Sequence, residues 1–539
     1  MEPTTRNPSQ WMWRSVWIAL MVLVTSLPYL INYFYTPTGF HYTWIIPPYP
    51  QDSLGYRAWS EQAARGALLF KIKYTALPHA PFFFHPLFLL CGFVSSLLGC
   101  DVGLVLFFAK AVGVVLFFWA FFRYVDYLNL NPLQSIIATV LVGVASGFGW
   151  LALKLGVQAD SIFTAPIDLN TPDSITFWSL LWNPLFPFTL ALMVIAVHLV
   201  DRGARLQRIR ELWWSGICVG VMALLHPFQV PVLLIVGIVI VMVRQRQSSI
   251  RSLFHFLIPA APLVLWVLVV AILNPVSVMP NEPGRMHAPT PLRYMLGLGL
   301  PLFVTLGGLI WKPRRLALEY WPLLWWLIVS VVFTFSPLWF DLKCVLGVQL
   351  PLCILAAVIC DWIVARIPKD PTRQRVVVFA AMVLLPLLVS SHIYLFAAHR
   401  GITQENKDGV YYIRDDLLDA LNFLKHNSQP DDIVFATYST SQLIPGFSGN
   451  TVVWGHWAMT VDFESRKEWV TNIFDAQSDW SPEKRRHEFW GAGIRFILAD
   501  GELKQWFEDN HPTWLTDRAE KVFENKSAII YRKRDQFAE

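Results

Sequence analysis

Long apolar runs separated by short polar breaks occupy the chain from Trp17 to Ala398. A helix needs roughly 20 apolar residues to cross about 30 Å of hydrocarbon, so these runs predict a polytopic α-helical membrane protein. The first run is longer than a signal peptide and lacks a small-residue cleavage site, which favours an anchor helix. We predict about eleven spans, at residues 15–35, 103–125, 133–155, 178–200, 213–226, 229–243, 253–272, 293–311, 318–337, 344–364 and 375–397.

From Gly401 to Glu539 the pattern changes, because charged residues recur every few positions and no apolar run reaches spanning length. We therefore predict a transmembrane domain at 1–400 and a soluble domain at 401–539. The alternation within the second domain predicts an α/β fold, a three-layer sandwich with a mixed sheet. We expect helices at 415–426, 463–474, 482–490 and 503–510, and strands at 433–437, 451–454, 495–499, 521–524 and 528–532.

Basic residues gather in four of the short polar breaks, at 202–210, 244–251, 312–315 and 366–375. Short loops rich in Lys and Arg usually face the cytoplasm. With the N-terminus also inside, the number of spans leaves the C-terminal domain outside. We therefore predict a multi-pass protein of the inner (plasma) membrane, with a cytoplasmic N-terminus and an extracytoplasmic C-terminal domain.

A further apolar run, 81–99, bears on this orientation. If it crossed the membrane, segment 157–177 would be cytoplasmic, yet that segment has no Lys or Arg and carries Asp160, Asp168 and Asp173. The run also contains two prolines, which disfavour an independent span. We interpret it as a helix that lies in the membrane interface, with a spanning helix as the alternative.

Composition limits the chemistry that this chain can perform. It is 55% hydrophobic and 15% charged, with a mean hydropathy of +0.44, which is too apolar for an ordinary soluble protein. The net charge of +5 comes from the basic loops, so no nucleic-acid partner is expected. All six cysteines precede residue 401, so no disulfide framework holds the C-terminal domain. Phosphate-binding glycine loops, HExxH and zinc spacings are not found, so the use of nucleotide sugars is unsupported.

The outer loop between the first two predicted spans, 36–102, is long enough to carry function. After Pro50, residues 53–64 read as an amphipathic helix with Asp52 at the N-cap position and Gly66 as its stop signal. On these residues alone, a capping carboxylate is the favoured interpretation. A reactive carboxylate is the alternative, since it can accept the proton of an attacking hydroxyl.

Five segments carry a resemblance to a known family: PPYPQDSLGYRAWSEQAARG, FFFHPLFLLCGFVSSLLG, SLLWNPLFPFTLALMV, LLHPFQVPVLL and LPLCILAA. With the N-terminal anchor and the long outer loop, they resemble the GT-C superfamily of integral-membrane glycosyltransferases. The layout is similar to that of protein mannosyltransferases and aminoarabinose transferases, and most of all to uncharacterised bacterial members. The resemblance implies inverting transfer of a sugar from a polyprenyl-phosphate donor on the extracytoplasmic face, with Asp52 as general base. Many relatives carry a second acid beside it, whereas the next residue here is Ser53.

Several outer-side residues are candidates to bind the donor. Lys343 matches a basic residue that relatives carry at the start of the helix containing LPLCILAA, and His226 lies at a predicted turn where its imidazole can donate to a phosphate or a sugar hydroxyl. Tyr56 lies one helical turn from Asp52 and can stack on a sugar. The predicted substrate-binding residues are Tyr56, Lys73, His85, Asp173, His226, Arg285 and Lys343.

Each candidate also has a structural interpretation. Lys343 can pair with Asp341 or reach lipid headgroups, and His226 can bond to a nearby carbonyl. The acids of segment 157–177 are favoured as solvated loop residues. Their spacing matches no particular metal template, so no metal ligands are predicted, although use of a divalent metal stays open.

Three functions fit these observations. A glycosyltransferase of cell-envelope glycan biosynthesis is preferred; the alternatives are a transporter or flippase of lipid-linked sugars and a non-catalytic GT-C-like assembly protein. A transporter predicts internal repeats or charges buried within spans, and neither is evident in the sequence. The expected partners are a polyprenyl-phosphate sugar donor, an unknown glycan, lipid or protein acceptor, and membrane lipids.

Overall fold

The chain divides into two compact units in the computed structural model, which describes residues 8–157, 165–274, 276, 290–338, 340–367, 371–405, 409–475 and 478–535. The membrane unit comprises Met1–Leu27, Phe108–Leu268 and Gly284–Arg400. The loop–sheet unit comprises Pro28–Phe107, Val269–Pro283 and Gly401–Glu539. The first outer loop and the C-terminal region therefore belong to the same unit.

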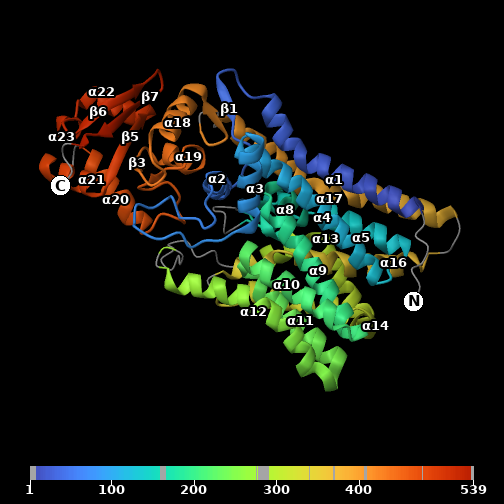
Figure 1. Cartoon of the computed structure of the whole chain (residues 1–539). Helices are drawn as coiled ribbons and strands as arrows, with labels where there is room; N and C mark the ends of the chain where they lie inside the picture. The colour runs from blue at the N-terminus through green and yellow to red at the C-terminus, as the bar shows by residue number, and fades with distance from the viewer. Residues whose placement is uncertain are drawn as a thin grey trace. The chain divides into compact units, whose positions relative to one another are not determined.

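Apolar helices make up the membrane unit, and α9, α10 and α11 pack side by side in it (Figure 1). The helices that lie wholly or partly in this unit are α1 (Pro8–Phe34), α4 (Val102–Tyr127), α5 (Pro132–Val144), α6 (Gly149–Lys154), α7 (Ile167–Asn170), η1 (Pro172–Ser174), α8 (Thr176–Trp182), α9 (Leu185–Leu206), α10 (Ile209–Leu225), η2 (Pro227–Gln229), α11 (Val230–Gln245), η3 (Arg246–Ser248), α12 (Ser249–Leu273), α13 (Pro291–Trp311), α14 (Pro313–Glu319), α15 (Trp321–Thr334), η4 (Asp341–Val345), α16 (Gln349–Val364) and α17 (Pro371–Glu405).

The predicted polytopic helical fold is confirmed, with fewer full-length spans than the sequence indicates. Within the described residues, eight helices are long and apolar enough to cross a membrane, or nine if α14 and α15, bent by 99°, form one broken span. The predicted span 133–155 is interrupted between α5 and α6, and α10 has only 17 residues. Run 81–99 forms α3 (Pro86–Leu98), whose 13 residues are too few for an independent span.

The break between α5 and α6 positions the loop that follows it. Ser146 donates its backbone N–H and its hydroxyl to the Leu388 carbonyl, at 2.7 and 2.6 Å, and Phe148 N–H donates to the Leu296 carbonyl at 2.7 Å. Gln349 joins both sides of the loop: its amide donates to the Ala145 carbonyl at 3.0 Å and accepts from Thr176 N–H at 2.8 Å. Non-helical backbone inside a helical bundle needs such partners because water does not reach it.

A five-stranded mixed sheet forms the centre of the C-terminal region, in the order β4–β3–β5–β7–β6 (Figure 1). The first three strands of this order are parallel to one another, and the pairs β5–β7 and β7–β6 are antiparallel. One face packs on α18 and α19, and the other on α20 to α23, so the predicted three-layer arrangement is confirmed. The bounds are β3 (Ile433–Phe435), β4 (Thr451–Val452), β5 (Ile494–Asp500), β6 (Ala519–Glu524), β7 (Ala528–Lys533), α18 (Asp415–Asn427), α19 (Tyr438–Phe447), α20 (Phe463–Phe474), α21 (Pro482–Gly491), α22 (Gly501–Asn510) and α23 (Thr513–Thr516).

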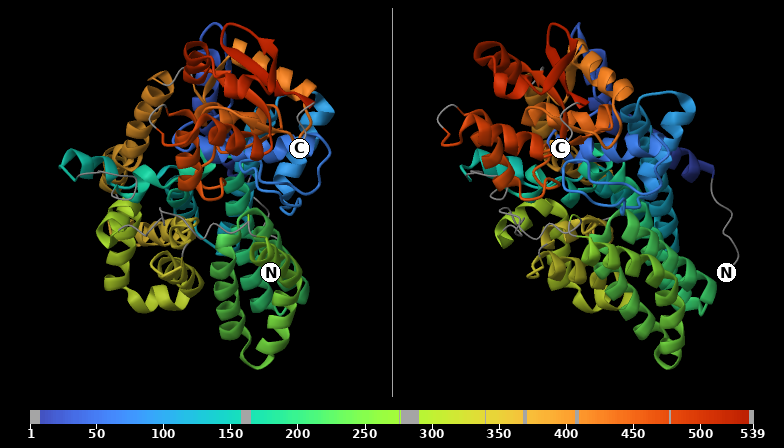
Figure 2. Two further views of the ribbon diagram at one scale, coloured as in Figure 1. Left: turned by 90° about the vertical axis from the view of Figure 1, so that its left-hand side faces the viewer. Right: turned by 60° about the vertical axis from the view of Figure 1, so that its left-hand side comes forward.

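The first outer loop completes one face of this sheet. Strand β1 (Phe40–Tyr42) pairs antiparallel with β2 (Tyr412–Arg414), and α2 (Pro50–Ala64) packs on α19. Leu54 and Ala58 of α2 are buried in the same hydrophobic core as strand residues of the sheet. Figure 2 shows the blue first-loop segments beside the orange and red C-terminal elements. The loop is thus an integral part of the C-terminal fold.

Candidate functional site

Asp52 is the third residue of α2, which begins at Pro50. The prediction that Asp52 is the N-cap is therefore wrong, because the proline starts the helix earlier and Tyr49 is the N-cap. A carboxylate in the first helical turn is stabilised by the exposed N–H groups and the helix dipole. The side chain is half-buried. Asp52 thus lies in the first turn of α2.

Arg57 fixes α2 to the rest of the loop–sheet unit. Its guanidinium makes two hydrogen bonds to the Asp101 carboxylate, one of 3.0 Å, and a third of 2.9 Å to the Gly446 carbonyl. The same group lies 3.7 Å from the centre of the Phe447 ring. Burial disfavours the charged form of Asp101, but the adjacent guanidinium outweighs it and lowers the pKa of this carboxyl.

Further contacts join α2 to the C-terminal region. Glu61 forms an ion pair of 2.7 Å with Lys425, and Arg65 donates to the Ser448 carbonyl at 2.5 Å. A side chain on Gly55 would meet the terminal methyl of Met459 at 2.9 Å, so this glycine permits close packing of the 455–461 loop. Gly55 is three residues from Asp52, and the C-terminal region thus positions the helix turn that bears the carboxylate.

The predicted residues Tyr56 and His85 both stack on the ring of Phe88. Tyr56 stacks on Phe88 with ring centres 4.9 Å apart, and His85 stacks on it at 3.9 Å. His85 also caps α3, because its Nδ1 accepts from Phe88 N–H at 3.4 Å. The imidazole therefore has a structural role at the start of α3, and Tyr56 is half-buried on the face that packs against this helix.

Lys73 is engaged within the loop–sheet unit. Its ammonium is 2.7 Å from the Pro430 carbonyl and 2.9 Å from the Asp431 carboxylate, and the side chain is only 4% exposed. Burial lowers the pKa of Lys73, whereas hydrogen bonds from Lys73 and Lys71 overcome desolvation and lower the pKa of Asp431 to about 2. This lysine joins the first loop to the turn before β3.

Three predicted residues of the membrane unit gather around η4. The Lys343 ammonium is 3.6 Å from the carboxylate of Asp173, which is buried in η1. The Lys343 carbonyl accepts from the side chain of Gln229 at 2.5 Å, and Gln229 lies in η2, the short helix that directly follows His226. Burial raises the pKa of Asp173 against the opposing effect of Lys343.

His226 ends α10 and is 5% exposed. Its ring lies edge-on to Phe186 and Phe228, with ring centres 5.7 and 5.3 Å away. We define the η4 cluster as Asp173, His226, Gln229 and Lys343. These residues come from three separate segments of the sequence, and only Lys343, at 30% exposure of its side chain, has substantial access to solvent.

Asp168 is a buried acid that is not among the predicted substrate-binding residues. Its carboxylate accepts from Gly149 N–H at 3.0 Å and from the Ser391 hydroxyl at 2.7 Å, while its other oxygen has no hydrogen-bond partner within the described chain. Burial raises the pKa of Asp168 to about 7. The interpretation of the acids in segment 157–177 as solvated is wrong for Asp168 and Asp173, because both side chains are buried. Their apolar neighbours in the sequence are the feature that could have predicted this burial.

Two residues that the sequence analysis names, Arg285 and Asp160, lie outside the described residues. Within the described ranges, no group of three or more His, Cys, Asp or Glu side chains is arranged to hold a metal ion. The structure therefore offers no specific donor set for a divalent cation in that part of the chain.

The sequence matches no protein-family model, and no curated protein is similar to it. Solved structures do share its fold. The archaeal oligosaccharyltransferase AglB from Archaeoglobus fulgidus, in complex with an inhibitory peptide and a dolichol-phosphate, aligns with 99% of this chain and 75% of its own, at 11% identity and a TM-score of 0.52. The Archaeoglobus fulgidus oligosaccharyltransferase in complex with Zn and sulfate aligns with 96% of this chain and 73% of its own, at 11% identity and a TM-score of 0.50.

A third solved structure, ArnT from Cupriavidus metallidurans bound to undecaprenyl phosphate, covers 97% of this chain and 99% of its own at 13% identity and a TM-score of 0.47. The alignments with the oligosaccharyltransferase extend over the membrane helices, the first outer loop and the C-terminal region. The chain therefore has the GT-C fold of integral-membrane glycosyltransferases.

Proposed function

We propose that this protein is a membrane glycosyltransferase that moves a sugar from a polyprenyl-phosphate donor to an acceptor on the extracytoplasmic face, with inversion. The observation that carries the proposal is the alignment of 99% of the chain with the oligosaccharyltransferase AglB, whose structure contains a dolichol-phosphate. Several helices suited to cross a membrane support a multi-pass protein. The basic breaks between spans support a cytoplasmic N-terminus in the inner (plasma) membrane.

Asp52 is the proposed general base. The acceptor hydroxyl loses its proton as it attacks the anomeric carbon, and a carboxylate that is ionised at neutral pH can take that proton. The position of Asp52 in the first turn of α2 supports this role, because the N-terminal end of a helix attracts negative charge. The many contacts that hold α2 restrict its movement. General-base catalysis needs such a fixed position, because the carboxylate must stay aligned with the acceptor hydroxyl.

Lys343 is the proposed partner of the departing polyprenyl phosphate. That leaving group carries its own negative charge, so it needs a cation or hydrogen-bond donors rather than a general acid. The ammonium is partly exposed, and the buried Asp173 carboxylate is on one side of it. In this proposal Asp173 orients Lys343, and His226 is a second donor on the neighbouring turn.

A transporter or flippase is the second candidate, and one residue favours it. Lys110 lies in α4, is 1% exposed, and donates its ammonium to the Thr25 carbonyl at 2.6 Å. A charged side chain inside a spanning helix is costly and often serves a translocation pathway. The expectation that no charge is buried within a span is therefore wrong for α4, whose mean hydropathy stays high enough for a span despite this lysine.

A turnover assay in detergent discriminates between the two functions, because detergent micelles have no compartments. Short-chain polyprenyl-phosphate sugars are incubated with the purified protein and a solubilised envelope extract as the source of acceptors. A transferase releases free polyprenyl phosphate and adds sugar to the extract. A flippase leaves the donor intact and moves it only in sealed vesicles, and that pair of results would refute the proposal.

A further inference from the structure

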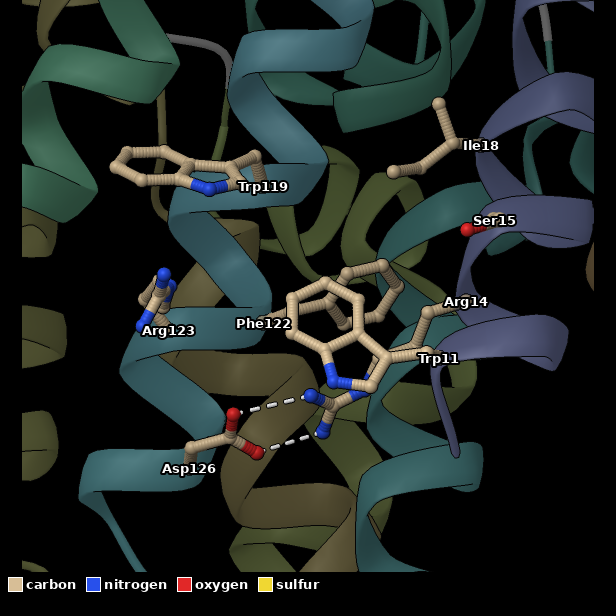
Figure 3. A pocket seen from close by; sticks show the side chains of 8 residues that line it. All are labelled: Trp11, Arg14, Ser15, Ile18, Trp119, Phe122, Arg123 and Asp126. Carbon is tan, nitrogen blue, oxygen red and sulfur yellow. Dashed lines mark hydrogen bonds and ion pairs between the residues drawn. The ribbon is translucent and has the colours of Figure 1, made fainter. Parts of the chain in front are cut away.

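A pocket lies between α1 and α4 in the membrane unit, and none of the residues proposed for sugar transfer lines it. It is lined chiefly by Trp11, Arg14, Ser15, Trp119, Arg123 and Asp126 (Figure 3). The room inside it for the centre of a water-sized group is about 40 Å³, and the pocket is partly open to solvent. This is more than one water molecule needs and admits a small polar group.

Arg14 and Asp126 form a fixed pair at the base of this pocket. Two hydrogen bonds, of 3.0 and 2.6 Å, join the guanidinium to the carboxylate, as Figure 3 shows. The guanidinium also lies 4.9 Å from the centre of the Phe122 ring. The positive charge of Arg14 thus balances the negative charge of Asp126.

Arg123 leaves the pocket with a net positive charge. Its guanidinium lies 5.5 Å from the centre of the Trp119 ring. Its Nε is buried and has no hydrogen-bond partner, and no ion pair of this residue is found among the described side chains. A guanidinium that lines a pocket and has no acidic partner among the described side chains favours an anionic oxygen ligand.

The pocket lies at an end of the helices that is suited to lipid headgroups. Trp11 and Trp119 are 44% and 46% exposed, as expected for aromatic side chains at a membrane–water interface. One turn beyond Arg123, Tyr127 donates to Asp201 at 2.8 Å, and Asp201 pairs with Arg244 at 2.9 Å. Asp201 and Arg244 lie beside the basic loops 202–210 and 244–251, so the pocket is at the same end of the helices as these loops. This is the end expected at the cytoplasmic leaflet, which contains anionic lipids.

We propose that this pocket binds the phosphate of an anionic phospholipid headgroup, with Arg123 as the main ligand. The guanidinium donates two N–H groups to phosphate oxygens, and Trp119 covers its face. Arg14 is held by Asp126 and shapes the pocket. This binding is separate from sugar transfer and ties α1 to α4 at the membrane surface.

The test is lipid binding by the full chain, purified in a neutral detergent and followed by native mass spectrometry. The protein is titrated with phosphatidylglycerol, with phosphatidylcholine and with inorganic phosphate. We expect phosphatidylglycerol to bind at least about tenfold more tightly than phosphatidylcholine, and Arg123→Gln to remove that difference. Arg123→Lys retains the charge and is expected to weaken binding less than Arg123→Gln.

Arg314→Gln is the matched control, because it removes the same charge from an exposed side chain of the membrane unit outside the pocket. It should bind phosphatidylglycerol as the wild type does. Equal binding by Arg123→Gln and Arg314→Gln would overturn the proposal. Binding of inorganic phosphate as tight as that of the lipid would assign the pocket to soluble phosphate and overturn the lipid assignment. A thermal unfolding profile of Arg123→Gln without lipid confirms that the variant is folded.

Discussion

The ammonium of Lys343 lies 3.6 Å from the carboxylate of Asp173, although 170 positions separate them in the sequence. Asp173 is 3% exposed and Lys343 is 30% exposed, so the pair has a buried acid and an accessible cation. The buried carboxylate fixes the orientation of the lysine side chain, and the exposed part of the ammonium is accessible to a ligand.

Replacing Lys343 by Gln should weaken binding of the polyprenyl-phosphate donor. If the ammonium supports the lipid phosphate, its loss removes a charge-assisted interaction, and the KM for the donor should rise by about tenfold or more. Steady-state kinetics with a polyprenyl-phosphate sugar measure this. Lys154→Gln, a change at an exposed lysine of the same unit, is the control. An unchanged KM in Lys343→Gln would exclude this residue from the phosphate site.

The stability of the protein should fall as the pH rises from about 4 to about 7, because of Asp168. Burial raises the pKa of this carboxyl to about 7 in the folded state, against an ordinary value near 4 in the unfolded chain. Between these values the folded state keeps a proton that the unfolded state has released, so the contribution to stability is complete below about pH 4 and lost above about pH 7.

Asp168→Asn tests this effect, since the amide is neutral at every pH and retains an oxygen for Gly149 N–H and the Ser391 hydroxyl. Wild-type Tm in detergent should decrease between pH 5 and pH 8 by more than the Tm of the variant. The extra decrease in the free energy of unfolding of the wild type, compared with the variant, is about 2–4 kcal/mol. The same pH dependence in both proteins would contradict the assignment.

Arg57→Ala should strongly destabilise the loop–sheet unit. It removes three hydrogen bonds and leaves the Asp101 carboxylate without its counter-charge, at a cost of about 3–5 kcal/mol. Limited proteolysis of the C-terminal region should become faster. Arg495→Ala removes an arginine from a surface pair with the exposed Asp535 and should cost about 1 kcal/mol or less. Equal protease resistance of the two variants would argue against the role of Arg57.

Gly147→Ala should impair folding of the membrane unit. A Cβ at this position would lie 2.2 Å from the carbonyl oxygen of Gly297, and because the obstructing atoms are backbone they leave little room to adjust. Overpacking of this kind costs about 1–3 kcal/mol or more. Gly307→Ala, where a Cβ meets nothing within 4 Å, is the matched substitution and should be tolerated. Size-exclusion profiles and Tm values in detergent compare the two.

The helices and strands of the C-terminal region could largely be predicted from its sequence, because their apolar spacing is regular and their caps are clear. The predicted helix 463–474 and strand 495–499 agree with α20 and β5 to within one residue at each end. The sequence does not predict helix α19, since YSTSQLIPGF combines hydroxyl residues with a proline and resembles a loop. Tertiary packing against α2 explains why it is helical.

Apolar runs alone do not predict where the membrane helices are interrupted. Residues 133–155 are mostly apolar, which predicts one span, whereas the break at Ser146 and Gly147 is stabilised by tertiary partners such as Leu388, which lies 242 positions away. The same limit applies to the candidate site. Arg57 meets Gly446 across 389 positions, and no local pattern predicts that contact. By contrast, the first turn of α2 could be placed near Asp52 because Pro50 and Gly66 bound the helix.

Sugar transfer by Asp52→Asn tests the central claim most directly. The assay measures release of polyprenyl phosphate from a polyprenyl-phosphate sugar in detergent, with Asp509→Asn on the exposed face of α22 as the control. Loss of a general base lowers the turnover rate by about 10²–10⁴-fold, and the variant should keep the wild-type Tm and donor affinity. Turnover at the wild-type rate by Asp52→Asn would contradict the account.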